Sequence, residues 1–262
     1  MLRELLAWGE MPSFVVGASA GAINGAYFAA TPTLAGVAQL EAIWVGLTRQ
    51  DLFPFNLRSV FGLLTRRAHL VDSHGLRRLL ERHLPYEQLQ DAAIPIHIVA
   101  SDMVTGEEVL LSTGSTVNAV LASAAIPGVF PPVLVNGQLL VDGGVANNTP
   151  ISTALRLGAT RIIVLPTGFA CALKKVPSGA VGRAMHALSL VVARQLVQDA
   201  QRLAAVVDLR IVPSLCPLEC SPYDYSAAKV LIERAAATTR HWLQEGGLDR
   251  DGAPMQLQPH SH

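Results

Sequence analysis

One serine of this chain has the surroundings that a catalytic nucleophile needs. Residues 17–21 read Gly-Ala-Ser-Ala-Gly, between the short apolar run 13–16 and an Ala-rich segment that ends near residue 30. A sharp strand-to-helix turn would expose the hydroxyl of Ser19 at the N-terminus of a helix, where the helix dipole favours developing negative charge. Small residues two before and two after the serine would let the strand and the helix approach each other. Ser19 is therefore a candidate nucleophile. A phosphate-binding turn or a plain tight turn is the alternative, although the lysine of a P-loop is absent.

A serine nucleophile needs a base, and Asp142 is the first candidate. It ends a span without charged residues, 109–141, directly after the apolar run 139–141, and Gly143 and Gly144 follow it. A single carboxylate at the end of a buried strand costs folding free energy unless it is paired or has a function. The two glycines would let backbone or substrate come close. The alternative is an aspartate that ends a strand and organises a turn.

Histidine is the usual base in serine hydrolases of the order serine, acid, histidine. Of the eight histidines, only His186 and His241 follow Asp142 outside the C-terminal tail. Both fall in the middle of predicted helices, whereas catalytic residues are found disproportionately on loops. A Ser-Asp-His α/β-hydrolase that uses one of them is the second enzymatic hypothesis, and replacing each by alanine would decide it.

The elements that would position Ser19 and Asp142 belong to a large apolar core. The chain has 262 residues, of which 50% are hydrophobic and 15% charged, and residues 11–40 carry no charge, like residues 109–141. Glycine and proline interrupt both spans, which argues against membrane helices and favours buried strand-turn-helix segments. We predict strands at 13–16, 94–100, 108–111, 133–135, 138–141, 161–165 and 209–212. We predict helices at the N-terminus and at 20–30, 34–47, 73–83, 116–124, 150–157, 180–207 and 225–243.

This alternation of strands and helices predicts an α/β fold with a mostly parallel sheet. Asn136-Gly137 predicts a type I′ hairpin between two of the strands. We expect a single domain over residues 1–248, with a core at 10–165 and a helical C-terminal part at 166–248. Residues 249–262 are polar and contain proline and glycine, so we expect a disordered tail.

Charge and cysteine content exclude several classes of protein. Lys+Arg and Asp+Glu are both 20, and a net charge of zero argues against nucleic-acid binding. Three cysteines, Cys171, Cys216 and Cys220, are too few and too scattered for a disulfide framework or a zinc site. We therefore expect no metal and no cofactor, in a reduced chain that is cytoplasmic or at a membrane surface.

Three motifs in order resemble those of patatin-like phospholipases of the bacterial type. They are residues 17–21, residues 122–132 (Ala-Ser-Ala-Ala-Ile-Pro-Gly-Val-Phe-Pro-Pro) and residues 142–150 (Asp-Gly-Gly-Val-Ala-Asn-Asn-Thr-Pro), within a resemblance over roughly residues 2–165. The resemblance implies a three-layer α/β/α sandwich. It also implies a phospholipase A-type acyl hydrolase that cleaves carboxylic esters through an acyl-enzyme, with Ser19 as nucleophile and Asp142 as base. Residues 122–127 would pack beside the serine turn, and residues 147–150 would shape the loop after the aspartate.

A further motif of that family has no counterpart here. The family carries a Gly-Gly-Gly-x-Arg/Lys-Gly loop, whose N–H groups form the oxyanion hole, ahead of the serine turn, whereas residues 1–16 hold one glycine, Gly9. We therefore expect that the N-terminal strand and this loop are missing and that translation begins upstream of Met1. A stop codon directly upstream would contradict this expectation. The alternative is a truncated, catalytically impaired protein or a lipid-binding remnant, because the loss of one oxyanion donor costs about 10²–10³ in rate.

The expected substrate, a phospholipid or another acyl ester, suggests contact with a membrane surface. Residues 51–67 are apolar outside the predicted core, with Phe53 and Phe55 near one end and Arg66 and Arg67 at the other. A packing cluster beneath a long connection is the favoured interpretation of this segment. A lipid-facing lip for peripheral membrane contact is the alternative.

Overall fold

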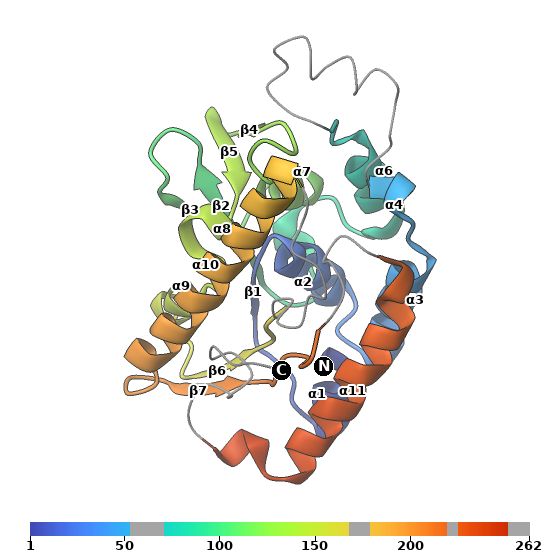
Figure 1. The fold of residues 1–262 in the computed structure, drawn as a ribbon, viewed down its shortest axis with the longest axis vertical. Helices are drawn as coiled ribbons and strands as arrows, with labels where there is room; N and C mark the ends of the chain where they lie inside the picture. Colours follow the sequence, from blue (N-terminus) through green and yellow to red (C-terminus); the bar gives the residue numbers. More distant parts are fainter. Residues whose placement is uncertain (53–70, 168–178, 219–224, 251–262) are drawn as a thin grey trace. The chain divides into compact units, whose positions relative to one another are not determined.

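The computed structural model describes residues 1–52, 71–167, 179–218 and 225–250, and it confirms the α/β class (Figure 1). Two compact units divide the chain. One is Pro12–Pro150, and the other combines Met1–Met11 with Ile151–His262. Residues 53–67 of the candidate lip lie outside the described residues, and so do residues 251–262 of the expected tail.

The first unit, Pro12–Pro150, contains a five-stranded sheet. Its strands are β1 (Val15–Ala18), β2 (Ile96–Asp102), β3 (Glu108–Leu111), β4 (Val133–Val135) and β5 (Gln138–Asp142). The order is β1-β2-β5-β4, and β3 also pairs with β2. Only β1 and β2 are parallel among these described pairings, which differs from the mostly parallel sheet that the sequence predicts. The reason is local, because short turns join β2 to β3 and β4 to β5, and such turns make neighbouring strands antiparallel.

The register brings the ends of β1 and β5 together. The residues of β2 that pair with β3 also pair with either β1 or β5, so β1 and β5 lie along the same edge of β2. β1 ends with Ala18 opposite Val99, and β5 ends with Asp142 opposite Ala100. Since β1 and β5 run toward each other along that edge, the residues that follow β1 must meet the end of β5.

The β4–β5 turn is the type I′ turn that the sequence predicts. Asn136 has φ 50° and Gly137 has φ 84°, and a type I′ turn requires positive φ at both central residues. The hairpin places Val135 opposite Gln138 and fixes the register of β5, and therefore the position of its last residue, Asp142.

The helices of the first unit are α2 (Ala20–Ala30), α3 (Leu34–Gly46), α4 (Arg49–Leu52), α6 (His74–His83), α7 (Thr116–Ser123) and the short α8 (Gly144–Asn147), with a 3-10 turn η1 (Leu89–Asp91). α2 packs on β1 through a face of small residues, since Ala22, Ala26 and Ala29 are fully buried. Both uncharged spans thus enter the core as expected. No helix in the described part of the chain is long and apolar enough to cross a membrane.

The second unit contains the parallel pair β6 (Arg161–Val164) and β7 (Asp208–Ile211). Its helices are α1 (Leu2–Trp8), α9 (Ile151–Arg156), α10 (Gly179–Leu203) and α11 (Ala228–Gln244), with 3-10 turns η2 (Tyr225–Ala227) and η3 (Gly247–Asp249). Leu5 of α1 is buried in a cluster with Val212, Leu243 and Leu248. Asp249, where the expected tail begins, still belongs to η3.

Candidate active site

Ser19 occupies a strained turn between β1 and α2. Its backbone has φ 52° and ψ −121°, outside the regions that non-glycine residues ordinarily adopt. A Cβ at Gly17 would lie 2.5 Å from the carbonyl oxygen of Gly21, so the turn requires glycine at position 17. A Cβ at Gly21 would meet nothing within 4 Å. The expectation that both flanking residues must be small is therefore wrong for Gly21, because its missing side chain would point into open space.

The side chains of Ser19 and Asp142 are hydrogen-bonded, although 123 residues separate them. The Ser19 Oγ donates to Asp142 Oδ2 at 2.7 Å. The other carboxylate oxygen, Oδ1, accepts the backbone N–H of Gly144 at 2.7 Å. The meeting of β1 and β5 along β2 explains this contact, since the two residues stand at the ends of those strands.

Asp142 is 6% exposed. Burial raises the pKa of its carboxyl to about 6, against the lowering effect of the hydrogen bonds from Ser19 and Gly144. The carboxylate is thus ionised at neutral pH but more basic than an ordinary aspartate. Such a group can accept a proton from the hydroxyl beside it.

Ser123, at the end of α7, holds the serine turn against the sheet. Its Oγ accepts the backbone N–H of Ser19 at 2.9 Å and donates to the carbonyl oxygen of Val99 at 2.6 Å. Its carbonyl oxygen accepts the N–H of Gly143 at 3.1 Å. For Ser123, the expectation that residues 122–127 pack beside the serine turn is confirmed. No contact of Ser123 is predicted from the sequence, although a serine between alanines in a buried helix indicates a polar side chain that needs a hydrogen-bond partner.

Ser101 supports the aspartate from the other side. Its Oγ donates to the carbonyl oxygen of Asp142 at 2.9 Å and accepts the N–H of Ala146 at 3.0 Å. A Cβ at Gly143 would overlap the carbonyl oxygen of Val99, so only glycine fits there. Sequence reasoning missed Ser101, although its position directly after the apolar run 98–100 could have indicated it.

The residues after the aspartate are also fixed by side-chain contacts. Asn147 donates through Nδ2 to Glu108 Oε2 at 2.7 Å, which ties α8 to β3. The Oδ1 of Asn148 lies close to Gly144, where a Cβ would approach it to 2.9 Å. Residues 147–148 therefore shape the segment that carries the Gly144 N–H, as expected.

The start of α2 offers N–H donors next to the Ser19 hydroxyl. The N–H groups of Ala22 and Ile23 bond to the Ser19 carbonyl oxygen at 2.9 and 3.2 Å. The N–H groups of Ala20 and Gly21 precede the first intrahelical bonds, and such groups have no acceptor within their own helix. Such N–H groups at a helix N-terminus favour negative charge beside them.

The two alternative bases are on helices of the second unit. His186 is on α10, and His241 on α11 lies 3.3 Å from Glu245 Oε1 with its side chain 72% exposed. His97 on β2 is half-buried, and its Nδ1 lies 2.7 Å from Ser112 Oγ. Among the described residues, no group of three His, Cys, Asp or Glu side chains could hold a metal ion.

Comparison with known proteins gives one family. A family model described as "Patatin-like phospholipase" matches residues 1–155. An "Uncharacterized NTE family protein" of Mycobacterium tuberculosis (strain ATCC 25618 / H37Rv) is 52% identical over 52 residues, which are 20% of this chain and 9% of that protein. "Patatin-like phospholipase domain-containing protein 6" of Homo sapiens is 26% identical over 170 residues, or 64% of this chain and 12% of that protein. The corresponding protein 7 of Mus musculus is 25% identical over 171 residues, with the same shares. The chain thus spans about a tenth of the length of these relatives.

Proposed function

The chain belongs to the patatin-like phospholipase family, and on that premise we propose that it hydrolyses carboxylic esters of lipids with Ser19 as nucleophile and Asp142 as base. Membership of this family supports lipid acyl hydrolase activity in general. The observation that carries the assignment of residues is the 2.7 Å hydrogen bond from the Ser19 hydroxyl to a buried carboxylate. The finer activity that we propose is of the phospholipase A type, on phospholipids or related acyl esters met at a membrane surface.

In the acylation step, Asp142 accepts the proton of the Ser19 hydroxyl while Oγ attacks the ester carbonyl carbon. The carbonyl π electrons move to oxygen, and the resulting oxyanion is stabilised by the N–H groups of Ala20 and Gly21 at the helix terminus. Collapse of the tetrahedral intermediate breaks the bond to the alkoxy oxygen. Asp142 returns its proton to that oxygen, so that an alcohol or lysophospholipid leaves and an acyl-Ser19 ester remains.

In the deacylation step, a water molecule takes the place of the departed alcohol. Asp142 accepts one proton of the water, and the water oxygen attacks the acyl carbon to form a second tetrahedral intermediate. The bond to Oγ then breaks, and Asp142 protonates Oγ. The products are a free carboxylic acid and the original Ser19 hydroxyl, so no cofactor is consumed.

The environment of Asp142 suits this double use of one carboxylate. A base works best when its pKa lies near the working pH, and burial raises the pKa of Asp142 to about 6. The N–H of Gly144 holds Oδ1, which leaves Oδ2 directed at Ser19. The same contacts allow the protonated carboxyl to return its proton to the leaving oxygen.

Labelling with a fluorophosphonate tests the proposal, because this probe reacts with an activated serine hydroxyl. We expect the full chain to be labelled at Ser19 and to release fatty acid from phosphatidylcholine vesicles. Ser19→Ala should lose both properties. Ser73→Ala is the matched control, since Ser73 precedes α6 and makes no capping hydrogen bond through its side chain.

The possible results separate the hypotheses. Hydrolysis that persists in Ser19→Ala would overturn the assignment of the nucleophile. A folded chain that binds vesicles but neither reacts with the probe nor releases fatty acid would instead be a lipid-binding remnant.

A further inference from the structure

The hydroxyl of Ser123 is bonded on two sides in the interior of the first unit. Ser123 is fully buried at the end of α7, where its neighbours Leu121 and Ala122 are buried too. Its Oγ donates its hydrogen to the carbonyl oxygen of Val99 at 2.6 Å, which leaves the lone pairs of Oγ for the N–H of Ser19 at 2.9 Å. The Ser19 N–H therefore has an acceptor whose position is set by α7 and β2.

This N–H belongs to the strained residue of the serine turn. Ser19 has φ 52° and ψ −121°, and such a backbone conformation persists only where the surrounding contacts enforce it. The two peptide groups that flank the Cα of Ser19 determine these angles. Its carbonyl oxygen accepts the N–H groups of Ala22 and Ile23 within α2. Its N–H donates to Ser123, so Ser123 supplies a contact that opposes relaxation of φ.

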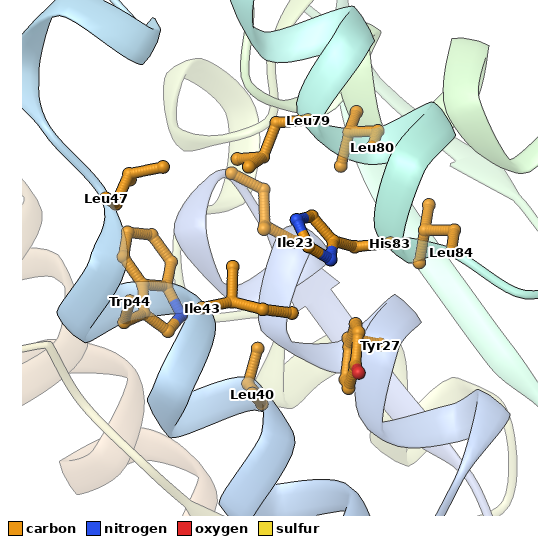
Figure 2. A pocket seen from close by; sticks show the side chains of 10 residues that line it. All are labelled: Ile23, Tyr27, Leu40, Ile43, Trp44, Leu47, Leu79, Leu80, His83 and Leu84. Carbon is orange, nitrogen blue, oxygen red and sulfur yellow. The ribbon is translucent and has the colours of Figure 1, made fainter.

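The helix that follows the turn is itself held in place. One side of α2 packs on β1 through small residues. Ile23 and Tyr27 of α2 face side chains of α3 and α6, among them Trp44 (Figure 2). The Oδ1 of Asn24 accepts the indole N–H of Trp44 at 2.7 Å, and its Nδ2 donates to the carbonyl oxygen of Ala20 at 2.9 Å. Since α2 is fixed by these contacts, the strain of the turn is concentrated in the residue that Ser123 restrains.

Ser123 also bonds to the residue that follows the candidate base. Its carbonyl oxygen accepts the N–H of Gly143 at 3.1 Å. Gly143 directly follows Asp142, whose Oδ2 accepts the Ser19 hydroxyl at 2.7 Å. A closed circuit therefore runs from Ser19 through Ser123 and Gly143 to Asp142 and back to Ser19. One residue of α7 thus contacts the backbone on both sides of the Ser19–Asp142 hydrogen bond.

We propose that Ser123 is a positioning residue for the reaction: its hydroxyl holds the Ser19 backbone in the conformation that directs Oγ to Asp142. This rests on the proposed function and adds a residue that touches neither the substrate nor the transferred proton. Without the hydroxyl, the Ser19 N–H loses its buried acceptor, the turn relaxes, and Oγ moves away from Oδ2. The groups that bind the ester are unchanged, so the defect lies in kcat and not in KM.

Hydrolysis of a p-nitrophenyl ester by Ser123→Ala tests the proposal. We expect kcat to fall by about 10- to 100-fold, with KM changed by less than about twofold, because the nucleophile is out of position for attack. Ser123→Thr keeps the hydroxyl and should retain most of kcat. Thr116→Val is the matched control, since Thr116 is fully buried on the same helix and its Oγ1 has no hydrogen-bond partner among the described residues. Its kcat should match the wild type.

The pKa of Asp142 gives a readout that does not depend on activity. The hydrogen bond from Ser19 lowers this pKa, so the loss of that bond should raise it. Titration of the Asp142 carboxyl by carbon-13 NMR should show a higher pKa in Ser123→Ala than in the wild type, and an unchanged pKa in Ser123→Thr and Thr116→Val. In the Ser19→Ala background, Ser123→Ala should raise the pKa no further. A merely structural role would lower the free energy of unfolding without moving this pKa.

Ser123→Cys is the second variant, for the case that Ser123→Ala does not fold. A thiol fills nearly the same space but is a weak donor and acceptor, so kcat should fall and the pKa of Asp142 should rise. An unchanged pKa of Asp142 in either variant, when folded, overturns the positioning role whatever its kcat. Hydrolysis that persists in Ser19→Ala overturns the proposed function instead, and the pKa comparison still decides whether Ser123 orients Ser19.

Discussion

Glu4 in the second unit and Asp142 in the first both expose little of their surface to solvent, yet their pKa values are shifted in opposite directions. Glu4 is 8% exposed and Asp142 is 6% exposed. Burial raises the pKa of both carboxyls. For Glu4, the hydrogen bonds and positive charges of Arg240 and Arg3 outweigh burial, so the pKa is lowered. For Asp142, burial prevails and the pKa rises to about 6.

Two things differ: Asp142 lies deeper in the protein than Glu4, and the two carboxylates have different partners. Glu4 accepts two hydrogen bonds from Arg240, at 2.9 and 3.0 Å, and one from Arg3 at 3.2 Å. Asp142 accepts its side-chain hydrogen bonds from a hydroxyl and a backbone N–H. A carboxylate paired with guanidinium groups has little tendency to take a proton, so Glu4 ties α1 to α11. A carboxylate held by neutral donors in the interior remains basic. Low solvent exposure alone therefore does not mark a base. Deep burial next to a hydroxyl, without a cationic partner, makes Asp142 the candidate base.

Asp142→Asn should give the largest effect. The amide cannot accept the Ser19 proton, so kcat for ester hydrolysis should fall by about 10²–10⁴. Glu4→Gln is the matched control, because it makes the same chemical change in the other buried carboxylate. We expect its kcat to stay within twofold of the wild type. Equal losses of kcat in the two variants, with both folded, would remove the distinction between the carboxylates.

Glu4→Gln should instead lower the free energy of unfolding, by about 1–2 kcal/mol at pH 7, since a charge-assisted network is lost and Arg240 is already 55% exposed. The pKa of Glu4 is lowered, so its stabilisation is present above its unfolded value of 4.5 and is lost as the pH falls through the folded value. Urea unfolding at pH 7 and pH 3 should therefore show a deficit that shrinks in acid. A deficit that is independent of pH would mean that the carboxylate charge is not its cause.

Asp142→Asn should change stability in the opposite sense. The pKa of Asp142 is raised from 3.8 to about 6. Ionisation of Asp142 therefore destabilises the folded state as the pH rises from about 4 through 6, and this destabilisation is absent below pH 3.8, the pKa in the unfolded chain. The variant should be more stable than the wild type at pH 8, by about 1–3 kcal/mol, and this advantage should vanish near pH 3.5. A variant that is less stable at pH 8, measured by urea unfolding, would show that the hydrogen bonds to Asp142 matter more than its burial.

The smallest effect is expected for the histidines. His186→Ala and His241→Ala should each leave kcat/KM within twofold of the wild type, because Asp142 occupies the position of the base. A loss of 100-fold or more in either variant, with unchanged thermal unfolding, would favour a Ser-Asp-His triad instead.

Local signals allowed most elements and both candidate residues to be predicted. Asn136-Gly137 fixed the β4–β5 hairpin because few residues adopt positive φ at two successive positions. The glycine at position 17 marked the serine turn because a side chain there would meet the backbone of α2. Asp142 stood out as a charge at the end of a long apolar span.

The features that could not be predicted from the sequence depend on pairing between segments that are far apart in the chain. The antiparallel pairing of β5 with β2 and the meeting of β1 and β5 on one edge follow from the register of β2, which no local pattern encodes. The hydrogen bonds of Ser101 and Ser123 were missed for the same reason, since their partners lie 41 and 104 residues away. The pairing of Glu4 with Arg240 spans 236 residues.

The most direct test of the Ser19–Asp142 assignment is the pH dependence of Ser19 labelling by a fluorophosphonate, measured in three proteins. They are the wild type, the double variant His186→Ala/His241→Ala, and Asp142→Asn. In the wild type, we predict that the labelling rate rises with pH to a plateau, with a midpoint near pH 6. The double variant should keep this midpoint. Asp142→Asn should be labelled much more slowly, and its labelling rate should show no transition near pH 6. A midpoint that disappears with the histidines, or that survives in Asp142→Asn, would contradict the role of Asp142 as the base.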